Sequence, residues 1–331
     1  MRLAALEDAR HSVDERIASL RELEDRIASM EGLSGITGLA DATASMRQLN
    51  RAERRWREHL LDNLGQIVAY VGVNLQGTVY FFDPRDTKSG QTFFIEQSVR
   101  RDQAQLRRAV DLLDSVGALP NRDLFLDVGA HIGTTTIYAV RHLSFAGALA
   151  IEPAVENVLL LRLSTVANGI DHMVRVVQAA VSDETAVAVM DVGGAGSEYH
   201  RIEVAAEPPL ARLVPTMTLD QLVADGSLDP DRLSLVWMDI EGYEGNALLG
   251  ASRLLANRVP IVMEACPKKL ERAGMLHRIR EIVSGHYTHV YDLRSQKDSA
   301  TFRPVEEIDD LIDGYGQHCT DLLLCSPDRN V

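Results

Sequence analysis

The sequence predicts an α/β fold in which a mostly parallel sheet carries helices on both faces. From residue 124 onward, short apolar runs alternate with stretches of helical periodicity. Four of these runs end at a carboxylate residue, and the first is followed by two glycines four residues apart. Acidic side chains are costly to bury, so we expect the carboxyl ends of the strands to border a solvated or ligand-filled cleft.

Seven strands are expected in this core, which extends from residue 124 to 326. They span residues 124–128, 148–151, 174–181, 233–239, 260–264, 286–293 and 321–325. The long interval between the third and fourth strands does not have the pattern of a plain helix. We expect residues 185–217 to form an insertion of extra strands and a mobile loop beside the carboxyl ends of the sheet.

The N-terminal region is expected to be helical and separate from the core. Residues 1–31 carry an apolar residue at every seventh position: Leu6, Val13, Leu20 and Ile27. This heptad pattern predicts either a coiled coil that joins two copies or binds a partner, or an amphipathic helix that folds back on its own domain. Residues 32–65 are interpreted as a linker marked by Gly32, Gly35 and Gly38, followed by an arginine-rich helix over residues 40–64.

The main domain is expected to span residues 66–331. Before its core we expect a hairpin or a pair of short strands over residues 69–82 and a helix over residues 97–116.

Composition limits the class of protein. The chain has 331 residues, of which 46% are hydrophobic, and a formal net charge of -14. The negative charge argues against a general affinity for nucleic acids or anionic membranes. No apolar run approaches 18 residues, so no membrane span is expected and a cytoplasmic protein is predicted.

The cysteines also bear on the compartment. Three cysteines fit a reducing environment. Cys319 and Cys325 would lie roughly 20 Å apart along one strand, which is too far for a disulfide. No histidine lies near either of them at ligand spacing, so a zinc site is not expected.

The glycine turn after the first core strand is typical of a nucleotide pocket. Asp127 ends the strand, Gly129 and Gly133 allow a tight turn, and the N–H groups of the following helix are free donors. The dinucleotide fingerprint requires glycines where this chain has His131 and Thr134, which argues against a nicotinamide oxidoreductase. Glu152 follows the next strand and is placed to accept hydrogen bonds from ribose hydroxyls.

Four segments resemble the FkbM family of S-adenosylmethionine-dependent methyltransferases. They are residues 125–133, 150–153, 218–220 and 238–244, and the resemblance extends over about residues 69–326. It implies a class I methyltransferase sheet of seven strands, the last antiparallel to the others. It also implies methyl transfer from S-adenosylmethionine to a hydroxyl or carboxyl oxygen of a sugar, glycan or secondary metabolite.

The resemblance assigns residues to the cofactor. Asp127, Gly129, Ala130 and Gly133 would surround its methionine part, and Glu152 would hold the ribose. The expected cofactor-binding residues are Asp127, Gly129, Ala130, His131, Gly133, Thr134, Glu152, Pro153, Asn157 and Ala180. His131 is interpreted either as a base or as a residue that packs in the turn.

Two acidic residues are expected to be catalytic. Asp239 and Glu241 alternate at the end of the fourth strand, so both side chains could face the cleft. One could accept the proton of the acceptor, or the pair could hold a divalent cation together with Glu264. We expect the metal-free arrangement. Tyr199 and His200 follow a glycine-rich loop and either contact the substrate or are ordinary loop residues.

The competing interpretation is a scaffold. In this alternative the chain is a coiled-coil assembly protein whose methyltransferase-like domain is not catalytic. It is favoured by Trp237, which stands where the FkbM family usually has lysine. The expected partners are a small-molecule or glycan acceptor and a second copy of the chain through the N-terminal helix.

Overall fold

A computed structural model describes residues 36–96, 101–191, 201–203, 211–295 and 301–327. The chain divides into two compact units, residues 1–59 and 60–331. The predicted heptad segment, residues 1–31, lies outside the described residues. Among the residues that are described, no helix combines the length and the apolar character needed to cross a membrane.

Helix α2 (Ile36–Leu64) confirms the helix expected over residues 40–64. It begins earlier than predicted, so the assignment of Gly38 to a linker is wrong. One glycine inside a helix costs about 1 kcal/mol, which the other residues of a long helix can offset. On its exposed side Arg54 pairs with Glu58 and Arg57 pairs with Glu53, each across one helical turn.

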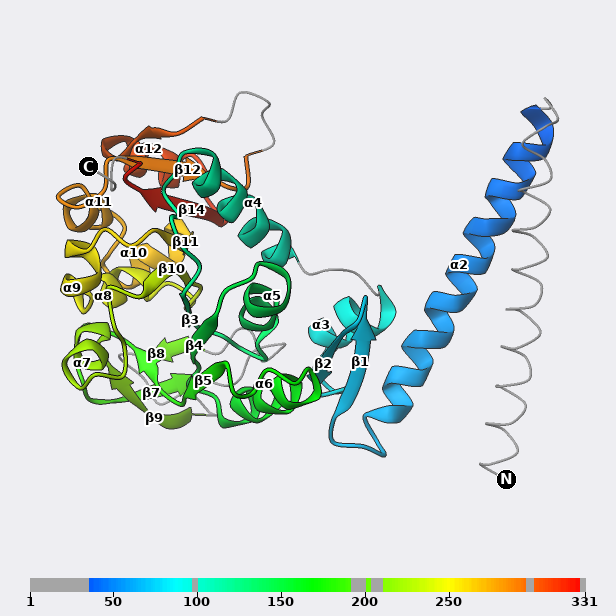
Figure 1. Cartoon of the computed structure of the whole chain (residues 1–331). Coiled ribbons are helices and arrows are strands. Elements are labelled where there is room, and N and C mark those ends of the chain that lie inside the picture. Colours follow the sequence, from blue (N-terminus) through cyan, green and yellow to red (C-terminus); the bar gives the residue numbers. More distant parts are fainter. Residues whose placement is uncertain (1–35, 97–100, 192–200, 204–210, 296–300, 328–331) are drawn as a thin grey trace. The chain divides into compact units, whose positions relative to one another are not determined.

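The main sheet has the predicted class I arrangement (Figure 1). Its strands are β3 (Leu124–Val128), β4 (Gly147–Ile151), β5 (Val174–Val177), β10 (Leu233–Met238), β11 (Ile261–Ala265), β12 (His289–Asp292), β13 (Arg303–Pro304) and β14 (Thr320–Cys325). Their order in the sheet is β13-β12-β14-β11-β10-β3-β4-β5. The last strand, β14, is antiparallel to both neighbours, as expected. The two-residue edge strand β13 was not predicted.

The third predicted strand, residues 174–181, is wrong in its second half. Strand β5 ends at Val177, and β6 (Ala180–Val181) pairs with a different sheet. An apolar run does not indicate where a strand exchanges one partner for another. The second sheet has the order β6-β9-β7-β8 and contains β7 (Val187–Asp191), β8 (Arg201–Glu203) and β9 (Ala211–Met217). The expected insertion of extra strands is therefore confirmed, while the loop over residues 192–200 lies outside the described residues.

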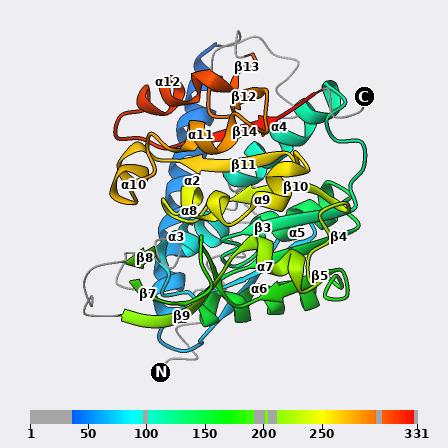
Figure 2. The same cartoon turned by 90° about the vertical axis from the view of Figure 1, so that its left-hand side faces the viewer.

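Helices cover both faces of the main sheet (Figures 1 and 2). One face packs against α4 (Arg101–Ser115), α5 (Thr134–His142) and α6 (Val155–Ala167). The other packs against α7 (Leu219–Ala224), α8 (Glu244–Leu249), α9 (Ser252–Ala256), α10 (Pro267–Arg272), α11 (Ile279–Val283) and α12 (Ile308–Asp313). Neighbouring strand residues alternate between the two cores: Phe125 belongs to the first and Leu126 to the second.

The predicted hairpin is formed by β1 (Val71–Leu75) and β2 (Thr78–Phe82). It is fixed to helix α6, because the Phe81 N–H donates to Ser164 Oγ and the Val79 N–H donates to Asn168 Oδ1. Phe93 of the short π-helix Gln91–Ile95 joins the same core. Helix α4 confirms residues 101–115 of the helix expected over residues 97–116, and residues 97–100 lie outside the described part.

Candidate active site

The turn after β3 requires glycine at two positions. Gly129 and Gly133 adopt φ values of 83° and 86°, and helix α5 begins immediately afterwards at Thr134. A Cβ atom at Gly129 would lie 2.0 Å from the carbonyl oxygen of Asp239, and one at Gly133 would lie 2.8 Å from Leu161 Cγ. The predicted strand, glycine turn and helix are confirmed, and the first N–H groups of α5 lie at the carboxyl end of β3.

Asp127 is a fully buried residue of β3. Its Oδ2 accepts hydrogen bonds from Thr135 Oγ1 at 2.6 Å and Thr136 Oγ1 at 2.5 Å. Within the described part of the chain, its Oδ1 is buried and has no hydrogen-bond partner. Burial raises the pKa of this carboxyl to about 6, although the threonine hydroxyls act in the opposite direction. An ammonium or hydroxyl group of a bound ligand would satisfy Oδ1.

Glu152 joins the glycine turn to the end of β4. Its Oε2 accepts a hydrogen bond from the His131 N–H at 3.0 Å, and its Oε1 accepts from the Ala154 N–H at 2.9 Å and Asn157 Nδ2 at 3.0 Å. Burial raises the pKa of Glu152 to about 7, although these three donors lower it. Each carboxylate oxygen has two lone pairs, so the side chain can still accept hydroxyl donors.

The remaining cofactor candidates lie near this pair. Ala130 is buried, and its N–H donates to the carbonyl of Ile151. Pro153 is half-buried beside Glu152. Ala180 packs with Ala154 in a small apolar cluster, although it belongs to β6 and the second sheet.

The structure brings together three carboxylates at the ends of β10 and β11. One side-chain oxygen from each of Asp239, Glu241 and Glu264 lies within 4.8 Å of the other two. The strand alternation expected for Asp239 and Glu241 is the wrong reason for this proximity. β10 ends at Met238, and Glu241 has φ 59°, so a left-handed turn places its side chain.

Two cations lie beside this carboxylate cluster. The Lys269 ammonium is 2.5 Å from Glu241 Oε2 and 2.8 Å from Glu264 Oε2. Arg294 lies 3.4 Å from Glu264 and makes two hydrogen bonds of 2.6 and 2.8 Å to Asp321. Burial alone would lower the pKa of Lys269, but Glu264 and Glu241 raise it above the ordinary value, so the ammonium stays charged.

Asp239 differs from its two acidic neighbours. Among the described residues it forms no ion pair, whereas Glu241 and Glu264 share Lys269. Burial, and then the charge of Glu264, raise the pKa of Asp239 well above its usual value. Its backbone N–H donates to the carbonyl of Val128 at 3.0 Å, so it adjoins the glycine turn. A carboxylate with a raised pKa is a stronger proton acceptor than an exposed one.

The family follows from a sequence comparison. The model of the methyltransferase FkbM domain matches residues 127–299, just over half of the chain. The chain belongs to the FkbM methyltransferase family. The matched region contains the glycine turn, Glu152 and the carboxylate cluster, and it supports S-adenosylmethionine-dependent methyl transfer. The resemblance expected over about residues 69–326 is thus confirmed for a narrower range.

Solved structures of other methyltransferases are similar to this FkbM protein at low identity. An O-methyltransferase from Bacillus cereus in complex with SAH has 13% identity and a TM-score of 0.39, over 69% of this chain and 82% of that one. A precorrin-6y C5,15-methyltransferase from Geobacter metallireducens has 13% identity and a TM-score of 0.34, over 64% and 86%. The tRNA methyltransferase TrmK from B. subtilis has 12% identity and a TM-score of 0.36, over 68% and 67%. No curated protein sequence matches the chain.

Sequence reasoning missed Lys269 and assigned no role to Glu244 of this FkbM methyltransferase. Glu244 Oε1 accepts from the N–H groups of Ile240 at 3.0 Å and Gly242 at 3.3 Å, which fixes the turn after β10. Burial raises its pKa to about 7. Glu244 is the first residue of α8 and follows Gly242 by two positions. An acidic residue at the start of a helix is the sequence signal that could have indicated its role in the turn. Nothing in the sequence distinguishes Lys269 from its neighbour Lys268.

The cysteine prediction needs a correction. Cys266 and Cys319 form a disulfide, with Cα atoms 4.2 Å apart. The two cysteines are 53 positions apart in the sequence and meet because β11 pairs with β14. A disulfide is typical of oxidising compartments, so the cysteines give no support to a reducing one. Cys325 is free and buried, so the prediction that Cys319 and Cys325 do not form a disulfide is confirmed.

Two predicted substrate residues, Tyr199 and His200, lie outside the described residues. Trp237, which stands where the family usually has lysine, is buried in the core that packs against α4, α5 and α6. Among the described residues, two cations lie next to the carboxylate cluster: Lys269, which comes from α10, and Arg294.

Proposed function

We propose that this FkbM methyltransferase transfers a methyl group to an oxygen atom, a hydroxyl or a carboxyl, of a sugar, glycan or secondary-metabolite acceptor. The observation that supports this most directly is the contact between the glycine turn and Asp239. The Cβ position of Gly129 lies 2.0 Å from the Asp239 carbonyl oxygen, so the glycine turn and the chain segment that carries Asp239 are directly adjacent.

The residues around the turn fit S-adenosylmethionine. Asp127 Oδ1 is a buried acceptor that has no hydrogen-bond partner among the described residues. We assign Asp127, Gly129, Ala130, His131, Gly133 and Thr134 to the methionine part, Glu152, Pro153 and Asn157 to the ribose, and Ala180 to the adenine. We assign His131 to the turn through its backbone N–H, which donates to Glu152.

Asp239 is the proposed proton acceptor. When bound, S-adenosylmethionine supplies an electrophilic methyl carbon on a positively charged sulfur. An acceptor hydroxyl reacts well only if its proton is removed or shared. Asp239 can take that proton at a carboxylate oxygen, because it forms no ion pair within the described part of the chain and because burial and the charge of Glu264 raise its pKa. Glu241, held by Lys269, would orient the acceptor.

We propose that proton transfer does not depend on a metal. Asp239, Glu241 and Glu264 could hold a divalent cation by their oxygen donors. Lys269, however, already contacts two of the three carboxylates, and an ammonium supplies positive charge at the same place. We also propose a small-molecule or glycan acceptor and not a nucleic acid, in keeping with the net charge of -14.

The test is product analysis with labelled S-adenosylmethionine and a metabolite and glycan extract of the source organism. The wild-type chain should form a product that carries one added methyl group on oxygen, and it should do so equally in EDTA. Asp239→Asn should reduce the rate about a hundredfold or more, while the exposed control Asp111→Asn should not change it. Methylation on nitrogen or carbon, or full activity of Asp239→Asn, would contradict the proposal.

A further inference from the structure

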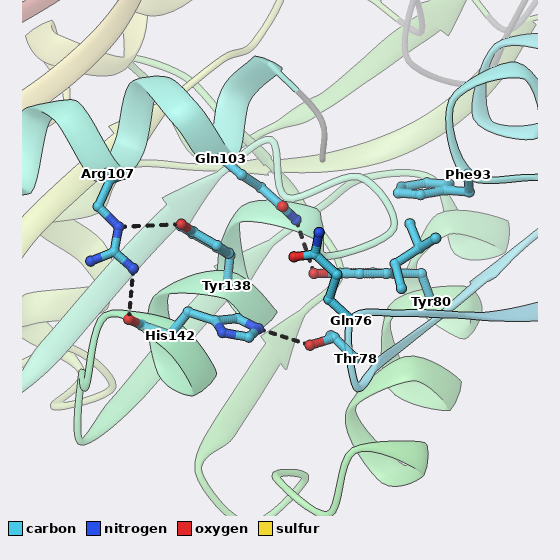
Figure 3. Close-up of a pocket in the computed structure, with 9 residues that line it drawn as sticks. Gln76, Thr78, Tyr80, Phe93, Gln103, Arg107, Tyr138 and His142 are labelled. Carbon is cyan, nitrogen blue, oxygen red and sulfur yellow. Dashed lines mark hydrogen bonds between the residues drawn. The ribbon is translucent and has the colours of Figure 1, made fainter. Parts of the chain in front are cut away.

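A pocket lies between the β1–β2 hairpin and helices α4 and α5 (Figure 3). None of the residues that line it belongs to the proposed methyl-transfer site. Its volume is about 260 Å³. Pockets for drug-sized ligands typically have roughly 300–1,000 Å³, so this one suits a smaller molecule. Its lining residues are Leu75, Gln76, Thr78, Tyr80, Phe93, Gln103, Arg107, Tyr138 and His142.

The floor of the pocket is polar although it is buried. Thr78, Tyr80 and Gln103 are only 1%, 3% and 3% exposed. Gln103 Nε2 donates to Tyr80 Oη at 2.9 Å and to the Thr134 carbonyl at 3.1 Å. In the described part of the chain, Gln103 Oε1 accepts no hydrogen bond. It is also not one of the fully buried side-chain atoms that lack a partner, so it is accessible from the pocket. The floor therefore retains an acceptor for a ligand hydroxyl.

The rim of the pocket carries positive charge and no negative charge. Arg107 is its charged residue, and none of the nine lining residues is acidic, in a chain of net charge -14. Arg107 donates to Tyr138 Oη at 3.3 Å and to the His142 carbonyl at 3.0 Å. A guanidinium has five N–H donors, so Arg107 can also bind an anion while it keeps these two bonds.

The other rim groups are neutral hydrogen-bonding groups. His142 Nε2 and Thr78 Oγ1 are 2.8 Å apart. Burial, followed by the charges of Arg141 and Arg107, lowers the pKa of His142, which favours the neutral ring. Phe93 stacks on Tyr80 with ring centroids 5.2 Å apart and adds an apolar surface.

We propose that this pocket binds a small hydroxylated carboxylate of monosaccharide size, such as a hexuronate. The carboxylate would bind Arg107, and the hydroxyl groups would bind Gln103, Gln76 and His142. Charge-assisted bonds to arginine give the site its preference for an acid over a neutral sugar. The site is also linked to the cofactor turn, because Gln103 holds the carbonyl of Thr134, the first residue of α5.

Two probes that differ only at C6, which is a carboxylate in one and a hydroxymethyl group in the other, test the proposal. Glucuronate and glucose are titrated separately into the full-length protein without cofactor, and binding is followed by saturation-transfer NMR. We expect glucuronate to bind about tenfold or more tightly than glucose, as a charge-assisted hydrogen bond predicts. Absence of a signal from glucuronate, or equal binding of the two sugars, would overturn the proposal.

The matched variants are Arg107→Gln and Arg162→Gln. Both arginines are exposed helix residues, but Arg162 lies on α6 outside the pocket. Arg107→Gln should weaken glucuronate binding about tenfold or more, and Arg162→Gln should leave it unchanged. S-adenosylhomocysteine affinity is measured on the same samples, so failure of this site and failure of the cofactor site are distinguishable. Equal effects of the two variants on glucuronate binding would contradict the proposal.

Discussion

The Asp239 carbonyl oxygen lies 2.0 Å from the place that a Cβ atom would occupy at Gly129. The chain segments that follow β3 and β10 are therefore so close that a side chain at position 129 would clash with the Asp239 carbonyl. Val128 and Asp239 are also joined by a backbone hydrogen bond of 3.0 Å. The glycine turn and the proposed base are held together by the backbone.

This contact predicts the effect of Gly129→Ala. The variant combines a left-handed backbone with a clash against a carbonyl, and we expect it to lose roughly 3 kcal/mol of unfolding free energy. Gly117→Ala is the matched control, since Gly117 has φ 69° and no neighbouring atom within 4 Å of its Cβ position. It should lose only about 1 kcal/mol. Urea unfolding measures both, and equal losses would exclude the proposed steric contact.

Cofactor binding should depend on pH through Glu152. Burial raises its pKa to about 7, and a ribose hydroxyl donates to the ionised form. The affinity for S-adenosylhomocysteine should therefore be constant above about pH 8 and fall as the pH drops below 7. Glu152→Gln should bind more weakly at pH 8 and lose most of this dependence, as calorimetric titrations at several pH values would show. An unchanged pH profile in the variant would remove Glu152 from the ribose site.

Lys269 should be required for turnover but not for cofactor binding. Lys269→Met leaves Glu241 and Glu264 without their shared cation, so their negative charge raises the pKa of Asp239 further and opposes its ionisation. We expect a loss of about tenfold or more in kcat with little change in S-adenosylhomocysteine affinity. Lys269→Arg should recover part of the rate. The exposed neighbour provides the control Lys268→Met, and a similar loss in that variant would argue against a specific role.

The Cys266–Cys319 disulfide should stabilise the region that carries Lys269. Cys266 directly precedes α10, and Arg294 donates to the Cys319 carbonyl at 3.0 Å. Alkylation of the denatured, unreduced chain should modify Cys325 alone. Reduction should lower the free energy of unfolding by about 2–4 kcal/mol. Alkylation of all three cysteines before reduction would show that the bond does not form.

Much of the fold could be predicted because the strands are apolar runs bounded by turn residues. The runs at residues 124–128 and 233–239 became β3 and β10, and the glycine turn was found by its spacing. The end of β5 could not be predicted, because residues 174–181 stay apolar while the chain changes sheets.

The parts of the site that escaped prediction depend on tertiary packing. Lys269 reaches the cluster because α10 packs against the turn at Gly242, whose Cβ position lies 2.6 Å from Lys269 Cβ. Cys266 and Cys319 meet only because β14 pairs with β11. In the sequence, Gln103 is one of several polar residues in an amphipathic helix. Its contact with the Thr134 carbonyl depends on the packing of α4 against α5. None of these contacts has a local signature in the sequence.

The most direct test of the central claim is calorimetric titration of the purified chain with S-adenosylhomocysteine. The account predicts one site per chain, with binding abolished by Asp127→Ala and by Glu152→Ala in variants whose circular dichroism matches the wild type. No heat of binding to the wild-type chain, or full affinity in both variants, would contradict it.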